Sequence, residues 1–357
     1  MSVSSHFFMK RVVFAVLAAL TLYAVVGTAA AAPPNDPYFS LQWGIQQINA
    51  DEAWATSTGA GQIVAIVDAG VDLSHPDLQG KLLPGATFTG CATNGPCGNG
   101  DWQSGNTTDP PSPHGTHVAG IAAAVTGNGI GIAGVARDAQ ILPVKVLTEA
   151  GGTFAEVGAG IRWATDHGAD VINLSLGAVP GVQALALTGV EADARTAIDY
   201  AYAHGVVVVA AAGNDFAGIC GEPGFNAHAL CVVATDSREA RAAYSNFPVQ
   251  EGMNVVAAPG GAAVLSCQDD IISTVPSGSE GTCGAGRPGY DFYAGTSMAT
   301  PHVTGVAALL TAQGRNVDAV FRILKSTART PVTGTRGAYT PTYGYGIVDA
   351  AAAVASP

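Results

Sequence analysis

The sequence Gly-Thr-Ser-Met-Ala-Thr-Pro-His-Val-Thr-Gly at residues 295–305 places one serine, Ser297, between small residues at the start of a predicted long helix. A strand-to-helix turn can present such a hydroxyl to a substrate with little steric hindrance. Two other stretches supply side chains that can act together with Ser297. His-Gly-Thr-His-Val-Ala-Gly at residues 114–120 opens another helix, and Ile-Val-Ala-Ile-Val-Asp at residues 63–68 is a predicted buried strand that ends in a carboxylate. Serine, histidine and aspartate together form a set suited to nucleophilic catalysis.

The three side chains run in the chain order Asp68, His114, Ser297. The order matters because a triad of serine, general base and orienting acid recurs on unrelated folds in different orders. An α/β-hydrolase needs its histidine well after the serine, whereas the one later histidine here, His302, follows almost at once. That fold is therefore excluded. The three motifs resemble those of the subtilisin-like serine peptidases, the subtilases, which have this order.

The resemblance implies roles for four residues. Ser297 would be the nucleophile, His114 the general base, and Asp68 the acid that orients the imidazole. Asn214 would stabilise the developing oxyanion together with the backbone amide of Ser297. Any one of these side chains, taken alone, is as well explained by a turn or a helix start. Their joint occurrence in subtilase order favours catalysis.

In the subtilases an extended peptide binds as an added strand between two backbone segments. The matching segments here are Ser175-Leu176-Gly177 and Ala150-Gly151-Gly152, and the primary specificity pocket matches Ala211, Ala212 and Gly213. None of the pocket residues carries a charge. The resemblance therefore implies protein or peptide substrates, with a neutral and large apolar residue before the scissile bond.

Apolar, β-branched runs of strand length alternate with helical patterns along the chain. The runs are residues 63–67, 141–147, 171–176, 206–212, 231–234 and 255–258, and the main helical patterns are residues 155–167, 192–203, 300–313 and 317–326. This alternation is typical of a parallel sheet covered by helices on both faces. The sequence thus predicts an α/β fold, a single domain with a doubly wound, mainly parallel β-sheet. Ligands of such sheets bind at the carboxyl ends of the strands.

The N-terminal residues have the features of an export signal. Lys10 and Arg11 precede an apolar run at residues 12–26, and small residues follow at 27–32. This is the pattern of a signal peptide, and the run is shorter than the ~20 residues of a membrane span. We expect residues 1–32 to be the signal peptide and residues 33–357 to be the catalytic domain of a secreted protein. We expect neither a propeptide nor an extra C-terminal domain.

Composition limits the partners. The chain has 357 residues, a net charge of −12, 48% hydrophobic residues and only 12% charged residues. Without Lys10 and Arg11 the net charge becomes −14, since no acidic residue precedes residue 33. This charge argues against nucleic acid and anionic membrane surfaces as partners. We expect a monomer that leaves the membrane once its signal is cleaved.

Six cysteines fit export to an oxidising compartment. Six allow fifteen pairings, and the sequence alone does not decide between them. The short separations favour Cys91 with Cys97, Cys220 with Cys231, and Cys267 with Cys283. A zinc site is disfavoured because no Cys-x-x-Cys pair occurs.

Calcium is the metal that the resemblance implies. The stretches at residues 35–39 and 118–128 look like the calcium-binding thermitase branch of the subtilases. By that match the side chains of Asp36, Asp77 and Asn128 and the carbonyls of Val125, Ile130 and Ile132 would hold the ion. Calcium takes six to eight oxygen ligands, and an irregular glycine-rich loop can supply carbonyls. The alternative is that Asp77 and Asn128 belong to ordinary turns.

Three features depart from the family pattern. Ala69 follows the triad aspartate where subtilases usually carry a hydroxyl or an acid, so one possible hydrogen bond to Asp68 is missing. The stretch from Cys267 to Cys283 is an insertion close to Ser297, on the leaving-group side. No propeptide is evident.

Two other functions stay open at this point. One is a noncatalytic binding module of the same fold. The other is a peptide ligase or cyclase, because hydrolysis and ligation share one acyl-enzyme and differ in the access of water to it.

Overall fold

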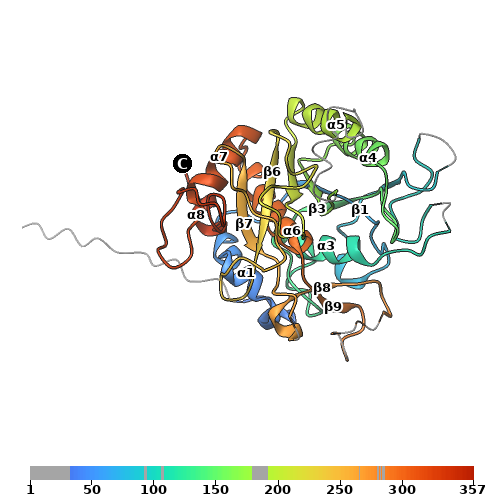
Figure 1. Ribbon diagram of the computed structural model, residues 1–357. Helices are drawn as coiled ribbons and strands as arrows, with labels where there is room; N and C mark the ends of the chain where they lie inside the picture. Colours follow the sequence, from blue (N-terminus) through green and yellow to red (C-terminus); the bar gives the residue numbers. More distant parts are fainter. Residues whose placement is uncertain are drawn as a thin grey trace, which may run out of the picture. The chain divides into compact units, whose positions relative to one another are not determined.

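A computed structural model of the protein describes residues 33–91, 95–105, 108–178, 192–264, 266–279, 281, 283 and 286–357 (Figure 1). The predicted signal peptide, residues 1–32, lies outside this part. The described chain belongs to the unit Ala32–Pro357.

Seven parallel strands form the central sheet. Their spatial order is β2 (Ala86–Thr87), β3 (Gln140–Lys145), β1 (Ile63–Asp68), β4 (Val171–Leu174), β5 (Val207–Ala211), β6 (Ala229–Thr235) and β7 (Val255–Pro259). The neighbours of β1 are β3 on one side and β4 on the other, so β1 lies at the point where the strand order reverses. Ligand sites of doubly wound sheets form at the carboxyl ends of strands near this point. Asp68, the last residue of β1, stands there.

Helices cover both faces of the sheet, as the sequence predicts. On one face lie α3 (His114–Ala123) and α6 (Thr296–Thr311), and on the other lie α4 (Phe154–Asp166) and α5 (Ala192–Ala203) (Figure 1). Side chains of β1 alternate between two hydrophobic cores. Val64 and Ile66 belong to one core, and Ala65 and Val67 to the other. Strands buried on both faces explain why their sequences are continuously apolar.

Helix α6 is buried along almost its whole length. Only Ser297 and Thr311, near its two ends, escape full burial. The helix contacts β4, β5, β6 and β7 on one face of the sheet. Its buried body therefore fixes the position of its partly exposed second residue.

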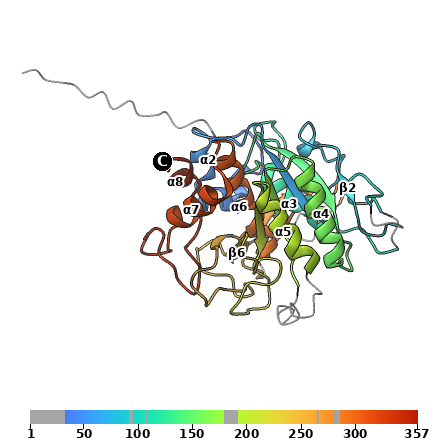
Figure 2. The ribbon, with the colours of Figure 1, turned by 90° about the horizontal axis from the view of Figure 1, so that it is seen from above.

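The two ends of the described chain meet. Helices α1 (Trp43–Gln47) and α2 (Ala50–Ala53) come early in the chain, and α7 (Val317–Thr327) and α8 (Ala350–Val354) come last. Helix α2 packs against α8, and Figure 2 shows both beside α7.

A two-stranded antiparallel sheet packs beside α3. It pairs β8 (Ile271–Thr274) with β9 (Tyr290–Tyr293). The hydroxyls of Ser273 and Thr274 donate to the carbonyls of His117 and Thr116 in α3. The sequence did not predict these strands.

The predicted elements exist, but some boundaries were wrong. The strands predicted at 141–147 and 171–176 end earlier, at Lys145 and Leu174, and the helix predicted at 300–313 begins at Thr296. Residues after these strands are still apolar but leave the ladder to form the edges of a groove.

All three predicted disulfides are present, between Cys91 and Cys97, Cys220 and Cys231, and Cys267 and Cys283. In the part of the chain that the structure describes, no helix combines the length and apolarity needed to cross a membrane.

Candidate active site

Asp68 and His114 form a close pair at the carboxyl end of β1. His114 Nδ1 lies 2.8 Å from Asp68 Oδ1. The Asp68 side chain is fully buried, whereas 31% of the His114 side chain is exposed. Helix α3 can approach β1 because it has Gly115, where a Cβ would lie 2.3 Å from the Gly70 carbonyl oxygen. The carboxylate thus holds one edge of an imidazole that is otherwise partly open to the groove.

The two carboxylate oxygens of Asp68 differ in their hydrogen bonds. The backbone N–H of Ala69 donates to Oδ1 over 2.7 Å, while Oδ2 is buried and no described residue bonds to it. This agrees with the expectation that alanine at position 69 leaves a donor missing. The carboxylate therefore concentrates its attraction on His114.

Opposing effects act on the pKa of His114. Burial lowers it, but the charge of Asp68 and the hydrogen bond from Nδ1 outweigh burial and raise the pKa above its ordinary value of 6.5. Glu149 adds to this attraction. His114 is consequently a stronger base than a free histidine.

His117, one turn further along α3, is a core residue. It is fully buried, stacks on Tyr293 with 4.4 Å between ring centroids, and places Nε2 3.2 Å from the Asp291 carbonyl oxygen. Burial lowers its pKa to about 3, so it stays neutral at ordinary pH.

Ser297 lies in the same groove as His114. Its hydroxyl donates to the Ser175 carbonyl oxygen over 3.2 Å, and its own carbonyl accepts from the Ser175 hydroxyl over 2.7 Å. The hydroxyl thus points to Ser175 rather than to His114. In enzymes without substrate, hydrogen bonds between nucleophile and base are often loose and tighten only in the complex.

Asn214 is held so that its amide nitrogen is available. Its Oδ1 accepts from the backbone N–H of Thr296 over 2.9 Å and from the Thr296 hydroxyl over 3.0 Å. A backbone N–H can only donate, so the oxygen must face Thr296 and Nδ2 is the atom left to donate elsewhere. Asn214, Ser297 and His114 line one cavity of about 500 Å³.

Asn246 supports the loop that carries Asn214. It is fully buried; its Oδ1 accepts from the N–H groups of Asp215 and Ala217, and its Nδ2 donates to the Ala212 carbonyl. Asn246 and Thr296 were missed at the sequence level because each contact depends on segments far apart in the chain.

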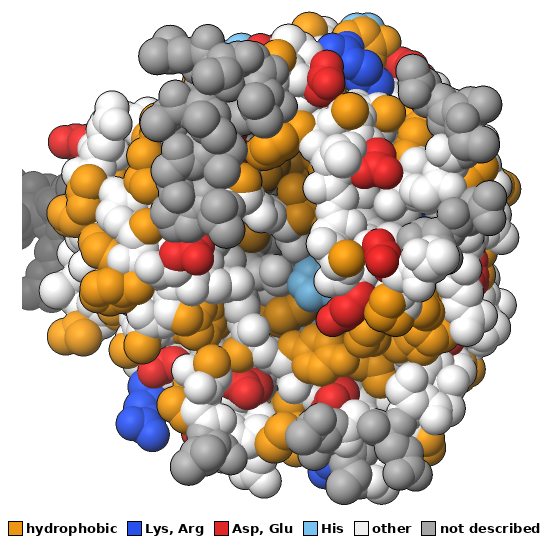
Figure 3. All heavy atoms as spheres, turned by 45° about the vertical axis from the view of Figure 1, so that its right-hand side comes forward, with side chains coloured by type: hydrophobic (Ala, Val, Ile, Leu, Met, Phe, Trp, Pro, Cys, Tyr) orange, Lys and Arg blue, Asp and Glu red, His pale blue; other side chains and the backbone are white. Residues whose placement is uncertain are grey.

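A second cavity of about 440 Å³ extends from His114 along the groove. Five of the nine predicted substrate-binding residues line it, namely Gly151, Gly152, Ser175, Leu176 and Gly177. Ala150 is exposed but does not line this cavity, nor do Ala211, Ala212 and Gly213, which directly precede Asn214. Figure 3 shows the hollow on this face, with a histidine side chain visible in it.

The wall of this cavity holds a charged residue that the sequence did not reveal. Glu222 lines it, is 1% exposed, and forms an ion pair with Arg195 of α5. The pairing joins two segments that are distant in sequence, so no local pattern could indicate it.

The predicted metal-binding residues are brought together around the loop after α3. Asp36 accepts from the N–H groups of Gly127 and Asn128, and Asp77 accepts from the N–H of Ile132 and the hydroxyl of Tyr290. Burial, with a smaller effect from Asp36, raises the pKa of Asp77 to about 6. Within the described residues no cluster of three or more His, Cys, Asp or Glu side chains is placed to hold a metal.

The predicted ligand groups of this loop differ in whether they already have hydrogen-bond partners. No described residue donates a hydrogen bond to the carbonyl oxygens of Val125, Ile130 or Ile132. Asn128, in contrast, turns its Nδ2 toward Asp77, 2.8 Å away, while its Oδ1 accepts from the N–H of Ile130.

Comparison with protein-family models gives a match to the subtilase family over residues 59–346. The chain belongs to the subtilase family. The matched region contains Asp68, His114, Asn214 and Ser297. This subtilase is therefore a serine-type endopeptidase, a hydrolase of peptide bonds.

Similar proteins are known in several bacteria. The subtilase is 42% identical to thermitase of Thermoactinomyces vulgaris over 298 residues, which cover 83% of this chain and 91% of thermitase. It is 38% identical to an extracellular protease of Xanthomonas campestris, covering 90% of this chain but only 56% of that relative. A solved protease structure from Pseudoalteromonas arctica has a TM-score of 0.74 and 36% identity, over 91% of this chain and 99% of that one. The fold is that of a subtilisin-like protease.

Proposed function

We propose that Ser297, His114, Asp68 and Asn214 are the catalytic residues of this endopeptidase. The observation that carries the proposal is the geometry at one groove: a buried carboxylate is bonded to a partly exposed histidine, and the groove also holds a serine at a helix start and an asparagine whose amide nitrogen is bonded by no described residue. Each group stands at the carboxyl end of the sheet or at the start of a helix that packs on it.

The proposed mechanism follows from these positions. His114 takes the proton of the Ser297 hydroxyl as the oxygen attacks the carbonyl carbon, and later gives it to the leaving amine. Asp68 holds the imidazole tautomer with Nδ1 protonated and stabilises the imidazolium. The Nδ2 of Asn214 and the backbone N–H of Ser297 stabilise the negative oxygen. Water then hydrolyses the acyl-enzyme.

We further propose that the peptide binds between residues 150–152 and 175–177, with a neutral apolar residue before the scissile bond. The exposed glycines at 151, 152 and 177 leave room for a backbone. The acid in the cavity wall, Glu222, is paired with Arg195, which offsets its charge. The glycines support the peptide-binding position, and the paired acid supports the neutral preference.

The first test compares the mature protein with Ser297→Ala on a chromogenic peptide anilide that has a large apolar residue before the bond. We expect turnover in the wild type and at least ~10³-fold less in the variant, because the nucleophile is gone. Equal turnover in both proteins would refute the assignment of Ser297. Mass analysis of products with an added amine distinguishes hydrolysis from the ligase alternative.

We propose one calcium ion near Asp36 and Asp77. The unbonded carbonyl oxygens of Val125, Ile130 and Ile132 support it, and so does the positive φ of 55° at Gly131, whose missing Cβ lets the loop contact Asp77. A divalent cation would also relieve the repulsion between the two carboxylates. Asn128 is included by family resemblance alone, because it presents nitrogen here. When bound, the ion would link the N-terminal segment to this loop.

We propose that the enzyme is secreted as a monomer after removal of residues 1–32. The signal-like sequence, three disulfides and two relatives named as extracellular proteases support secretion.

A further inference from the structure

The groove continues past Ser297 on the side away from the proposed acyl-binding segments. This part is the 500 Å³ cavity, lined by Ala263, Val264, Asp270, Phe292, Tyr293 and Met298 besides the catalytic residues. Since the acyl side of the peptide lies along residues 150–152 and 175–177, this cavity receives the residues after the scissile bond. The cavity therefore belongs to the leaving-group side.

Asp270 is the one acidic residue among the described residues that line this cavity, and no described Lys or Arg lines it. It ends the short 3₁₀ helix Cys267–Asp269 inside the cysteine-bounded insertion and directly precedes β8. The residue is 8% exposed. A carboxylate within this insertion therefore lines the same cavity as Ser297.

The two oxygens of Asp270 have different surroundings. Oδ1 accepts from the backbone N–H groups of Ala262 and Ala263, over 3.1 and 2.9 Å. Oδ2 is bonded by no described residue and is not among the fully buried unpartnered oxygens, and Asp270 is one of the residues that line the cavity. The carboxylate is thus anchored at one oxygen and offers the other to a ligand.

The rest of the cavity suits a long side chain with a cationic end. Phe292, Tyr293 and Met298 provide apolar surface beside Asp270. Lysine and arginine have apolar stems that pack on such surface while the charged end meets an anion. Figure 3 shows acidic side chains at several points around the hollow, with Lys and Arg confined to the edges of this face. The local field therefore favours cationic peptides.

We propose that Asp270 is the anionic end of a subsite for a lysine or arginine side chain at the first or second residue after the scissile bond. This inference rests on the proposed function, because the groove must bind a peptide for the subsite to act. It adds a basic preference on the leaving-group side to the apolar preference on the acyl side.

The test uses internally quenched peptides that share one apolar residue before the bond and carry Lys, Gln or Glu at the first or second position after it. For wild type we expect kcat/KM to be about tenfold higher for Lys than for Gln, which is the scale of one charge-assisted hydrogen bond in a half-buried site. We expect Glu to be the poorest. Product masses establish that cleavage occurs at the intended bond.

Asp270→Asn keeps an oxygen for the N–H groups of Ala262 and Ala263 but removes the charge. We expect it to abolish the difference in kcat/KM between Lys and Gln peptides. The matched control is Asp269→Asn, the neighbouring carboxylate, which bonds to Ser237 and does not line the cavity. It should keep the preference.

The wild type offers a check that needs no variant. One molar NaCl should reduce the Lys preference, because salt screens a partly exposed ion pair. Equal rates for Lys and Glu peptides in the wild type, or equal losses in both asparagine variants, would overturn the proposal.

Failure of the proposed function would look different, since no peptide would be cleaved. In that case the subsite is tested by measuring the binding of the same peptides to Ser297→Ala by fluorescence anisotropy. The subsite is supported if Ser297→Ala binds the Lys peptide more tightly than the Glu peptide and the Ser297→Ala, Asp270→Asn double variant does not. Equal binding of the Lys and Glu peptides to Ser297→Ala excludes the subsite.

Discussion

At the scale of single residues, the proposed mechanism depends on how Asp68 acts on His114. The carboxylate is fully buried, accepts from Ala69 at one oxygen and has no described donor at the other. Little else competes for its charge. A histidine must be neutral to accept the serine proton, so the pKa raised by Asp68 sets the lower pH limit of activity.

We expect kcat/KM to fall with decreasing pH through an apparent pKa above 6.5, because protonated His114 cannot act as a base. Asp68→Asn removes the attraction that raises this pKa while burial still lowers it, so the acid limb should move to lower pH. The rate at its plateau should fall by about 10⁴-fold because the imidazole loses its orienting acid. Profiles of both proteins on one anilide substrate measure this. An unmoved acid limb would mean that another group titrates.

At the scale of elements, the sequence predicted what depends on local pattern. The strands of the sheet are buried on both faces, so β1 and β5 have nearly continuous apolar sequences, and their short length and β-branched residues indicate strands. Their ends were less clear because residues such as Leu147 and Leu176 are apolar and yet border the groove. The pair β8–β9 was not predicted, since hydroxyl contacts to α3 fix its position.

In the candidate site, too, the sequence predicted the residues that belong to local motifs and missed those that depend on contacts between distant segments. Motifs predicted Asp68, His114, Asn214 and Ser297 as catalytic residues, and the structure brings them to one groove. The sequence pointed to the Cys267–Cys283 insertion but not to Asp270 within it, and Asn246 had no signal, because the positions of both residues depend on loops that meet only in the folded chain.

The loop that follows α3 carries the calcium prediction. We expect a chelator to lower the melting temperature, because an ion at a hundred times its dissociation constant contributes ~2.7 kcal/mol. Asp36→Asn removes one of the two carboxylates, so its melting temperature should respond much less to the chelator. Glu251→Gln, at an exposed loop position, should respond as the wild type does. A wild-type melting temperature that ignores both chelator and added calcium would rule out the site.

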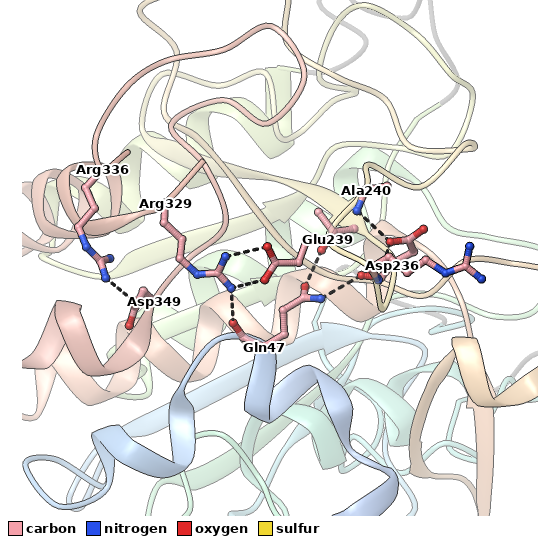
Figure 4. Close-up of polar contacts among 9 residues, drawn as sticks. Gln47, Asp236, Glu239, Ala240, Arg329, Arg336 and Asp349 are labelled. Atoms are coloured by element: carbon pink, nitrogen blue, oxygen red, sulfur yellow. Dashed lines mark hydrogen bonds and ion pairs between the residues drawn. The ribbon is translucent and has the colours of Figure 1, made fainter. Parts of the chain in front are cut away.

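At the scale of the whole molecule, polar contacts join early and late parts of the chain (Figure 4). Arg329, after α7, donates to both carboxylate oxygens of Glu239 and to the carbonyl of Gln47 in α1. The Gln47 side chain in turn donates to the Asp236 carbonyl and accepts from the Thr235 hydroxyl. One guanidinium therefore links the first helix, the loop after β6 and the C-terminal segment.

This link should be worth more than an ordinary surface ion pair. The Arg329 and Glu239 side chains are 19% and 30% exposed, and the contact is bidentate. We expect Arg329→Ala to lower the free energy of unfolding by about 1–3 kcal/mol, since Glu239 and the Gln47 carbonyl lose a charged donor in a partly buried place. Arg322→Ala is the matched control: it removes an exposed arginine of α7, so its cost should be smaller. Denaturant unfolding of both variants measures the difference. If Arg329→Ala cost no more than Arg322→Ala, the Arg329 contacts would not hold the chain ends together, and other contacts, such as the packing of α2 against α8, would do so.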